Sequence, residues 1–417
     1  MKLRDAVIVG GVRTPVGRYM GAPKEVPAYD LAALVLKEVV KRGRVDPTQV
    51  NEVIFGQAYQ NGEYVNIARM ALLKAGWPES IPGVTLDRRC CTGLDVVCFA
   101  GMKIQSGNAD IVVAGGVESM STAEFYLPGE IKWGIGGKKA MPKGHGDLSL
   151  WGIPFYDRIQ RARVMSQPEE RYGILPAMMS WAETAAKDEG ISREACDQWS
   201  LSSHQKACSA IDAGKFKEEV IPVLVPQGKG DPVAVDLDEG PRADTTLKKL
   251  SQLKPVLGGV CTAGNSSSEN DGAAAVVVTS MEKARELGVE PFAKLKSFAV
   301  TGDDPRRTYR TVPTAVDQAL KKAGLRLGQI DLIEIQEAFA AQVLADLKEM
   351  GVTEKDYDRI NVNGSGISLG HPIACTGTRV LVTLLHEMRR RNARFGLECI
   401  CGGGGLGIAA IFERGPM

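Results

Sequence analysis

The sequence predicts a layered α/β protein made of two similar β/α halves. Its 417 residues exceed what one hydrophobic core usually holds. Short buried strands alternate with helices, a pattern that produces stacked sheet and helix layers. Four short signatures also recur in one order, at a separation that stays near 280–288 residues. The recurring pairs are Lys41-Arg42-Gly43 with Lys322-Ala323-Gly324, Gln49–Val53 with Gln329–Ile333, Cys91-Thr92-Gly93 with Cys375-Thr376-Gly377, and Gly115-Gly116 with Gly403-Gly404.

The first half is expected to open with alternating strands and helices. Strands are predicted at Ala6–Val9 and Val53–Gly56, and a helix at Ile67–Lys74. Another helix is expected from a cap at Asp30 to Lys41, because apolar residues share one face and Gly43 follows.

The stretch from Asp87 to Asp95 joins a strand to a helix that is apolar on nearly every side, and such a helix belongs inside a protein. Cys90 is placed at the start of this helix, where free N–H groups and the helix dipole favour the thiolate. The alternative is that Cys90 is a small buried residue without a chemical role.

The chain changes character after Met120. Residues 121–175 are irregular and rich in Gly, Pro and aromatic residues, as expected of a segment that covers a site or a partner. The predicted division is an N-terminal half from 1–120 plus 250–285, an inserted loop domain at 121–249 and a C-terminal half at 286–417. Within the insertion, helices are expected at 177–188 and, capped by Ser192, up to 212, with strands at 220–225 and 233–236.

Composition narrows the function. A net charge of +1 gives no general attraction to nucleic acid or to anionic membranes. The nine cysteines lack metal-site spacing and fit free thiols in a reducing compartment, so a cytoplasmic protein without metal or redox cofactor is expected. No run of the sequence approaches membrane-spanning length.

A cysteine nucleophile needs a base and donors for an oxyanion. Of the four histidines, His371 alone lies in a glycine-lined turn, whereas His145, His204 and His386 lie in irregular or helical surroundings. Cys401 ends a buried strand that runs into glycines. Each of these residues also has a structural reading, as a turn histidine or a buried thiol.

Many motifs along nearly the whole chain resemble the thiolases, the CoA-dependent acyltransferases. They include Arg13-Thr14-Pro15, the Cys90 turn, Gly115–Ser121, Thr262-Ala263-Gly264-Asn265, Asn270–Ala274, Glu337-Ala338-Phe339, Gly370-His371-Pro372 and the glycines after Cys401. The resemblance implies a layered αβαβα fold, a homodimer or homotetramer, and coenzyme A and acyl-CoA as substrates.

The resemblance also implies site residues. Cys90 would carry the acyl group, His371 would accept its proton, and Cys401 would exchange a proton with the α-carbon of the second acyl-CoA. The N–H groups of Cys90 and Gly403 would hold one oxyanion, and His371 with Gln336 would hold the other.

Three positions depart from the family pattern. Gln336 stands where Asn or His is usual, and activity is expected to survive this change. Cys91 stands where Gly or Ser is common. Ala177, beside Met178, falls where short-chain enzymes have a His, which suggests room for a different or larger acyl chain.

For coenzyme A, the resemblance points to Ser267 at the pantetheine arm and Arg242 near the adenine, with Ala263 and Met178 as further substrate contacts. A plain turn serine and a surface arginine are the alternatives. Lys138-Lys139 is interpreted as a solvated face.

Two other functions fit these residues less well. A decarboxylating or ketoacyl-synthase type of enzyme generally has a second His at the position of Cys401. A non-catalytic acyl-CoA-binding or lipid-binding protein, or a supporting subunit, is expected to lose the nucleophile or the base, and this chain has both.

Overall fold

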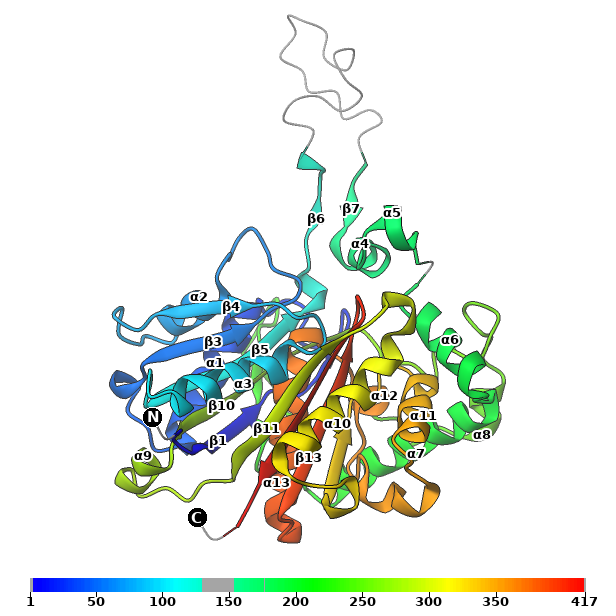
Figure 1. Ribbon diagram of the computed structural model, residues 1–417. Helices are drawn as coiled ribbons and strands as arrows, with labels where there is room; N and C mark the ends of the chain where they lie inside the picture. The colour runs from blue at the N-terminus through cyan, green and yellow to red at the C-terminus, as the bar shows by residue number, and fades with distance from the viewer. Residues whose placement is uncertain (1–2, 130–153, 176, 416–417) are drawn as a thin grey trace, which may run out of the picture.

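The computed structural model describes residues 3–129, 154–175 and 177–415. Within these ranges, ten strands form one mixed sheet, in the order β12-β13-β14-β11-β1-β10-β5-β3-β4, with β2 beside β10 (Figure 1). Its strands are β1 (Ala6–Arg13), β2 (Gly17–Arg18), β3 (Glu52–Gly56), β4 (Gly83–Leu86), β5 (Ile111–Ser119), β10 (Asn270–Ser280), β11 (Ala293–Gly302), β12 (Leu332–Ile335), β13 (Phe395–Gly402) and β14 (Leu406–Glu413).

Apart from β4, equivalent strands follow one another in the same order from each edge of the sheet toward its centre. The parallel pair β3 and β5 corresponds to β12 and β13, and the antiparallel strands β10 and β1 correspond to β14 and β11. Among the strands of the described residues, the two half-sheets pair only where Val7 and Ile8 of β1 meet Lys294 and Ala293 of β11. The predicted repeat of two β/α halves is therefore confirmed.

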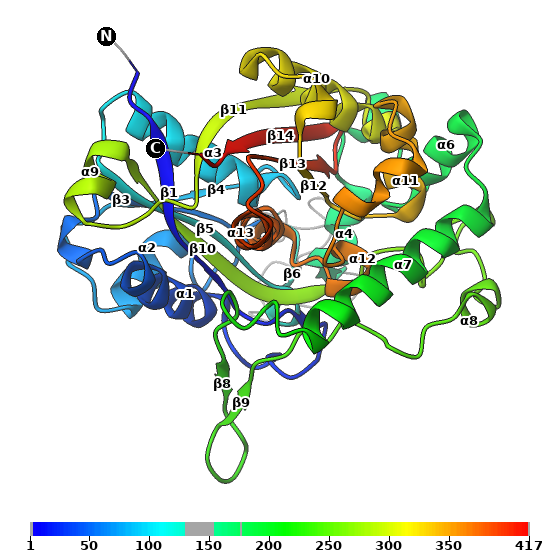
Figure 2. The same ribbon diagram turned by 90° about the horizontal axis from the view of Figure 1, so that it is seen from below.

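Helices form three layers around the two halves of the sheet. The outer layers are α1 (Ala28–Arg42) and α2 (Ile67–Lys74) on the first half, and α10 (Thr311–Ala323) and α11 (Ala340–Glu349) on the second. Helices α3 (Thr92–Gln105) and α13 (Ile373–Arg391) pack against each other and against both halves, so they form the middle layer (Figure 2). The result is the expected αβαβα stack, with one apolar core under each outer helix layer and a third around the middle helices.

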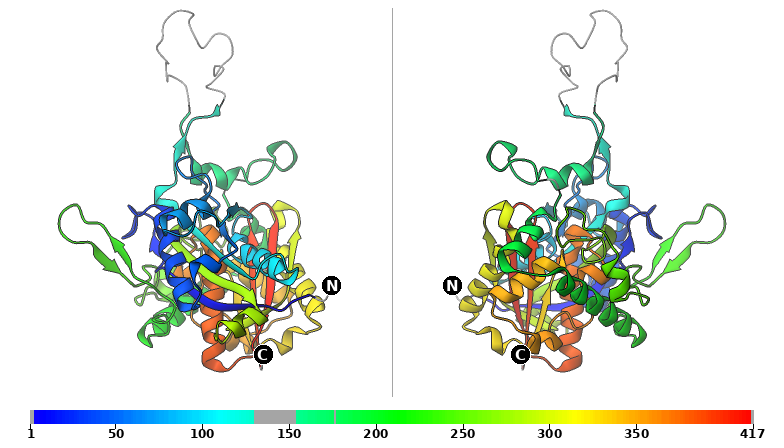
Figure 3. Two further views of the ribbon diagram at one scale, coloured as in Figure 1. Left: turned by 90° about the vertical axis from the view of Figure 1, so that its left-hand side faces the viewer. Right: turned by 90° about the vertical axis from the view of Figure 1, so that its right-hand side faces the viewer.

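The remaining elements surround this body. Strands β6 (Phe125–Tyr126) and β7 (Tyr156–Asp157) pair at the root of the insertion, and the hairpin of β8 (Val223–Val225) and β9 (Val233–Val235) projects from the body (Figure 3). The other helices are α4 (Arg158–Val164), α5 (Glu169–Tyr172), α6 (Ser180–Glu189), α7 (Arg193–Asp212), α8 (Leu247–Ser251), α9 (Met281–Glu286) and α12 (Gly366–Leu369). His145 and Lys138-Lys139 lie outside the described residues.

Of the predictions for the ends of individual helices and strands, one is confirmed and two are wrong. Ser192 caps α7 as expected, since its hydroxyl accepts the N–H of Ala195 at 3.1 Å. The cap predicted at Asp30 is wrong: α1 already begins at Ala28, and Asp30 lies in its first turn. There its carboxylate still faces the positive end of the helix. The strand predicted at 220–225 is also shorter than expected, because β8 begins only at Val223.

No helix in the described ranges combines the length and the apolar character that crossing a membrane requires.

Candidate active site

The two middle helices cross at their first turns, and this crossing brings the site together. A Cβ on Gly93 of α3 would lie 2.7 Å from the backbone N of Gly377, and a Cβ on Gly377 would lie 2.2 Å from that of Leu94. Only glycine permits so close an approach. The Thr378 hydroxyl adds a bond of 2.7 Å to the Gly93 carbonyl. The repeated Cys-Thr-Gly motif is thus the contact between the halves, and it places the N-termini of α3 and α13 side by side.

Cys90 precedes α3 in a tight turn. Arg89 adopts a left-handed backbone with φ of 53°, and its N–H is held by the Asp87 carboxylate at 2.7 Å. The Thr92 hydroxyl accepts the Arg88 N–H and donates to the Arg89 carbonyl, each at 2.6 Å. These bonds fix the turn that presents the Cys90 thiol.

His371 lies directly against that thiol. Its Nε2 is 3.1 Å from Cys90 Sγ, although 281 positions separate the two residues in the chain. The main-chain N–H of His371 donates to Asn270 Oδ1 at 2.8 Å, which anchors the turn to β10.

Thr376 holds the other side of the imidazole. Its Oγ1 lies 2.7 Å from His371 Nδ1 and 3.0 Å from the Pro372 carbonyl. When the hydroxyl donates to that carbonyl, its oxygen accepts a hydrogen bond from Nδ1–H, and Nε2 is free to accept the thiol proton. When the hydroxyl turns and donates to Nδ1, Nε2 carries the proton and becomes a donor. One hydroxyl rotation therefore supports both tautomers.

Burial favours the neutral form of both the cysteine and the histidine. Burial raises the pKa of Cys90 to about 11, although the Gly403 N–H and Arg89 act in the opposite direction. Burial, assisted by the Arg379 cation, lowers the pKa of His371 to about 3. Desolvation therefore opposes the thiolate that the helix dipole favours at this position, and the thiolate stays a prediction. Proton transfer between the two residues must accompany the attack of sulfur.

Cys401, near the end of β13, and Gly403, just after the strand, lie beside the same sulfur. Cys401 is 1% exposed, and burial and the neighbouring Cys90 raise the pKa of its thiol far above the usual value. The N–H of Gly403 faces Cys90 Sγ and favours its charged form. A Cβ on Gly403 would meet Met178 Cε at 2.6 Å, so Met178 closes this side of the site.

Cys91 points the other way. Its side chain is fully buried among the apolar residues between the two half-sheets, and Sγ lies 3.6 Å from the Ile400 carbonyl. Of the two adjacent thiols, Cys90 alone contacts His371.

Gln336 follows β12 and is fully buried. Its backbone N–H donates to the Cys399 carbonyl at 3.0 Å, while neither side-chain amide atom has a hydrogen-bond partner among the described residues. The amide abuts Gly366, where an added Cβ would lie 2.4 Å from Nε2. A buried, uncommitted amide is suited to a polar group of a bound substrate.

Glu337, the next residue, has a structural role that sequence analysis did not identify. Its carboxylate accepts Trp199 Nε1 at 3.0 Å, the Ser203 hydroxyl at 2.7 Å, Asn361 Nδ2 at 3.0 Å and the Ile367 N–H at 3.1 Å. These bonds tie α7 and α12 to the strand end that carries Gln336.

The predicted coenzyme A residues are only partly brought together. Arg242 and Ala263 line one cavity of about 420 Å³, together with His204, Ser266 and Ser268. Ser267 does not line it, and its N–H instead pairs with the Ala338 carbonyl at 2.9 Å. The cavity adjoins the site through Ser268, which bonds Asn270 Oδ1 at 2.8 Å, the same oxygen that accepts the His371 N–H.

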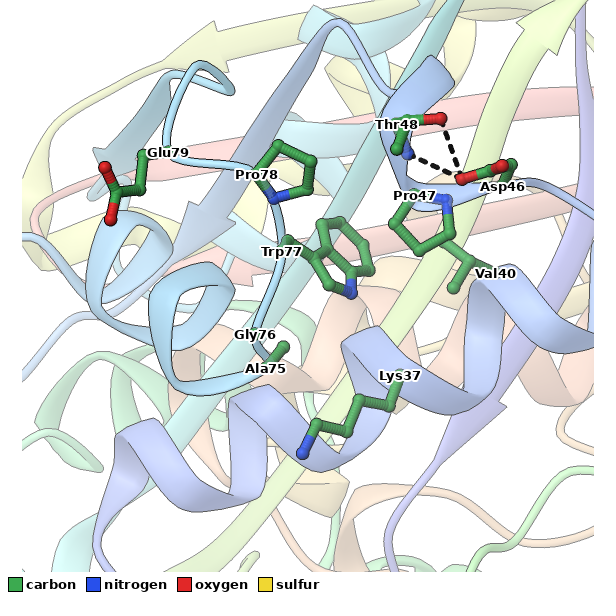
Figure 4. A pocket seen from close by; sticks show the side chains of 10 residues that line it. All are labelled: Lys37, Val40, Asp46, Pro47, Thr48, Ala75, Gly76, Trp77, Pro78 and Glu79. Atoms are coloured by element: carbon green, nitrogen blue, oxygen red, sulfur yellow. Dashed lines mark hydrogen bonds between the residues drawn. The ribbon is translucent and has the colours of Figure 1, made fainter.

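A second cavity, of about 620 Å³, lies far from this chemistry. Trp77 stands in it between Pro47 and Pro78, on the outer face of α1 (Figure 4). None of the predicted site residues lines it.

Comparison with known proteins decides the family. The profile described as "Thiolase, N-terminal domain" matches residues 6–282, and "Thiolase, C-terminal domain" matches residues 289–414. The chain belongs to the thiolase family. Along the chain, the boundary between the two matched regions lies between β10 and β11, so each region holds the strands of one half-sheet. The finer limits predicted for the inserted loop domain stay a prediction.

Individual family members are similar over their whole lengths. An acetyl-CoA acetyltransferase of Cupriavidus necator is 44% identical over 99% of this chain and 100% of its own. The crystal structure of the Bacillus anthracis acetyl-CoA acetyltransferase has a TM-score of 0.89 at 38% identity and covers 99% of both chains. That of human mitochondrial 3-ketoacyl-CoA thiolase also has a TM-score of 0.89, at 33% identity, with 100% of both chains covered.

Proposed function

We propose that the protein makes or cleaves a 3-oxoacyl-CoA, in which an acyl group passes between coenzyme A and Cys90. Membership of the thiolase family establishes an enzyme of CoA-dependent acyl transfer. The observation that carries the residue assignment is the 3.1 Å contact between Cys90 Sγ and His371 Nε2.

In the first half-reaction, Cys90 attacks the thioester carbonyl while His371 Nε2 takes the thiol proton. The N–H groups of Cys90 and Gly403 hold the oxygen as charge develops on it. The proton then passes to the departing CoA sulfur, and a thioester on Cys90 remains. A neutral pair suits this step, because no buried ion pair has to exist before substrate arrives.

In the condensing direction, Cys401 in its thiolate form removes a proton from the α-carbon of acetyl-CoA, and the resulting carbanion attacks the acyl-cysteine. The carbon–sulfur bond to Cys90 breaks, 3-oxoacyl-CoA is released, and the removed proton returns to the Cys90 sulfur. The thioester oxygen of this second substrate is held by His371 Nε2–H and by the free amide of Gln336. His371 is thus an acceptor in one half-reaction and a donor in the other. The two hydrogen-bond partners of the Thr376 hydroxyl support this exchange.

The cavity lined by Arg242 and Ala263 is proposed to hold coenzyme A, and Met178 to contact the acyl group. Coenzyme A is a substrate in this scheme, and no further cofactor takes part. A cytoplasmic location is proposed. A homodimer or homotetramer is also proposed, because β4 ends the sheet with an edge that pairs with no other strand of the described residues.

The test is direct acylation. The protein is incubated with acetyl-CoA, and the peptide that contains Cys90 is examined for an acetyl mass increase of about 42 Da, as covalent catalysis requires. A panel of 3-oxoacyl-CoA substrates, varied in chain length and branching, is assayed for CoA-dependent cleavage in parallel. Absence of both the adduct and cleavage refutes the proposal and favours a non-catalytic acyl-CoA-binding protein.

A further inference from the structure

A separate cavity of about 490 Å³ lies near the C-terminal end of α13. Gly10 and Gly11 of β1, the loop after α9, and His386 and Arg389 of α13 line it. His371 precedes the N-terminus of the same helix, roughly 20 Å from His386 at 1.5 Å per residue. The cavity is therefore distinct from the catalytic site.

His386 is the buried polar group of this cavity. The residue is 6% exposed, and no group of the described residues makes a well-formed hydrogen bond to either ring nitrogen, although the Gly11 backbone lies close enough to raise the pKa of the imidazole. Its ring packs edge-on against Phe292 at 5.0 Å. Burying an imidazole without well-formed hydrogen bonds is destabilising. A ligand in the cavity would recover that cost.

Three arginines line the same cavity as the histidine. Arg389 lies one helical turn away, with its guanidinium 4.1 Å from the centre of the Phe292 ring, and Arg44 is exposed in the turn after α1. Neither forms an ion pair with another described residue. Arg42, by contrast, is already bonded to Glu38 and to the Glu218 carbonyl.

Two carboxylates also reach the cavity. Glu218 Oε2 lies 3.6 Å from His386 Nδ1, and Glu290 Oε1 lies 4.0 Å from Arg414. Both side chains are about three-quarters exposed, at 73% and 75%, so water competes for them and neither distance is a hydrogen bond.

We propose that this cavity binds the phosphoryl group of a small phosphate-bearing molecule through Arg44, Arg389 and a ring N–H of His386. Planar guanidinium groups match the oxygens of a phosphoryl group, and the histidine adds a directed donor. The volume exceeds that of a phosphate ion and lies within the usual range for organic ligands. Phe292 supplies an apolar surface for the rest of the molecule.

The experiment follows the four histidines by NMR, with the imidazole Cε1 labelled with ¹³C. The His386 signal is identified by its loss in His386→Phe. The intact protein is titrated with inorganic phosphate, glycerol phosphate or succinate, and affinities are confirmed by calorimetry. The variants are Arg44→Gln and Arg389→Gln. The matched control is Lys41→Gln, which removes a nearby charge that is 78% exposed and does not line the cavity.

We expect phosphate and glycerol phosphate to shift the His386 signal in a saturable way, with glycerol phosphate tighter. Arg44→Gln and Arg389→Gln should each weaken binding about tenfold, while Lys41→Gln changes it less than about twofold. A His386 signal that stays fixed overturns the proposal. An equal loss in Lys41→Gln means an adventitious ion only, and saturable binding of succinate without phosphate refutes the phosphoryl assignment.

Discussion

The imidazole Nε2 of His371 and the sulfur of Cys90 lie 3.1 Å apart, at the crossing of two helices from opposite halves of the protein. The neighbouring thiol of Cys91 faces the Ile400 carbonyl instead. Two adjacent cysteines thus have different surroundings, and this difference can be measured.

Exchanging each cysteine for serine tests the assignment. Cys90→Ser should lower kcat at least about a thousandfold, because a hydroxyl is a far weaker nucleophile than sulfur. Cys91→Ser should keep activity within about threefold, since its Sγ contacts only the protein interior. Steady-state cleavage of a 3-oxoacyl-CoA measures both. Equal losses in the two variants would contradict the assignment.

Thr376 should affect kcat because its hydroxyl holds the imidazole of His371. Thr376→Val keeps the shape of the side chain but leaves Nδ1 without a partner, so kcat should fall about 10–100-fold with little change in KM. The control is Thr378→Val, another buried threonine of α13, whose hydroxyl bonds Gly93 and not the histidine. If both variants lose stability to a similar extent and kcat falls only in Thr376→Val, Thr376 positions the base. A similar fall in Thr378→Val would argue for general destabilisation.

The duplicated architecture was predictable because the repeat leaves matching glycines in the sequence. Gly93 and Gly377 mark the helix crossing, and that crossing brings the Cys90 turn to His371. The protonation states were not predictable, because the depth at which Cys90 is buried depends on the whole fold. Burial then outweighed the helix dipole that the local sequence suggested.

Two other features of the site could not be predicted from any pattern in the sequence. Thr376 belongs to the repeated motif, but nothing in its spacing says that its hydroxyl meets Nδ1. Among the three consecutive serines 266–268, the flanking two face the cavity and Ser267 pairs its backbone with Ala338. Which serine faces a ligand depends on the local path of the backbone, and composition does not reveal that path.

The rate at which Cys90 is alkylated should depend on pH as expected for a thiol with a raised pKa. With the pKa near 11, the thiolate fraction rises about tenfold per pH unit between pH 7 and 10. The rate of carboxamidomethylation by iodoacetamide, measured by mass spectrometry at Cys90, should rise in proportion. A rate that is already level at pH 7 would indicate a preformed thiolate–imidazolium pair. The control is His371→Gln, which removes the imidazole and with it any such pair.

Gln336 should act through its amide. Gln336→Asn should change kcat by less than about tenfold, because the amide is retained, whereas Gln336→Leu should lower kcat about a hundredfold by removing a group that binds the thioester oxygen. Thermal unfolding of the Leu variant should be no lower than that of the wild type, since the buried amide has no protein partner to lose. A gain of more than about tenfold in Gln336→Asn (roughly 1.4 kcal/mol) would show that the longer side chain fits poorly.

Met178 should limit the length of the acyl chain. Its Cε lies where a Cβ on Gly403 would come within 2.6 Å, so the side chain borders the space next to the Cys90 sulfur. Met178→Ala should therefore raise kcat/KM for longer 3-oxoacyl-CoA substrates relative to acetoacetyl-CoA by about tenfold. The control is Met179→Ala, since Met179 packs in the same hydrophobic cluster and has no contact with Gly403. A ratio unchanged in Met178→Ala, or equally changed in Met179→Ala, would place the determinant of chain length elsewhere.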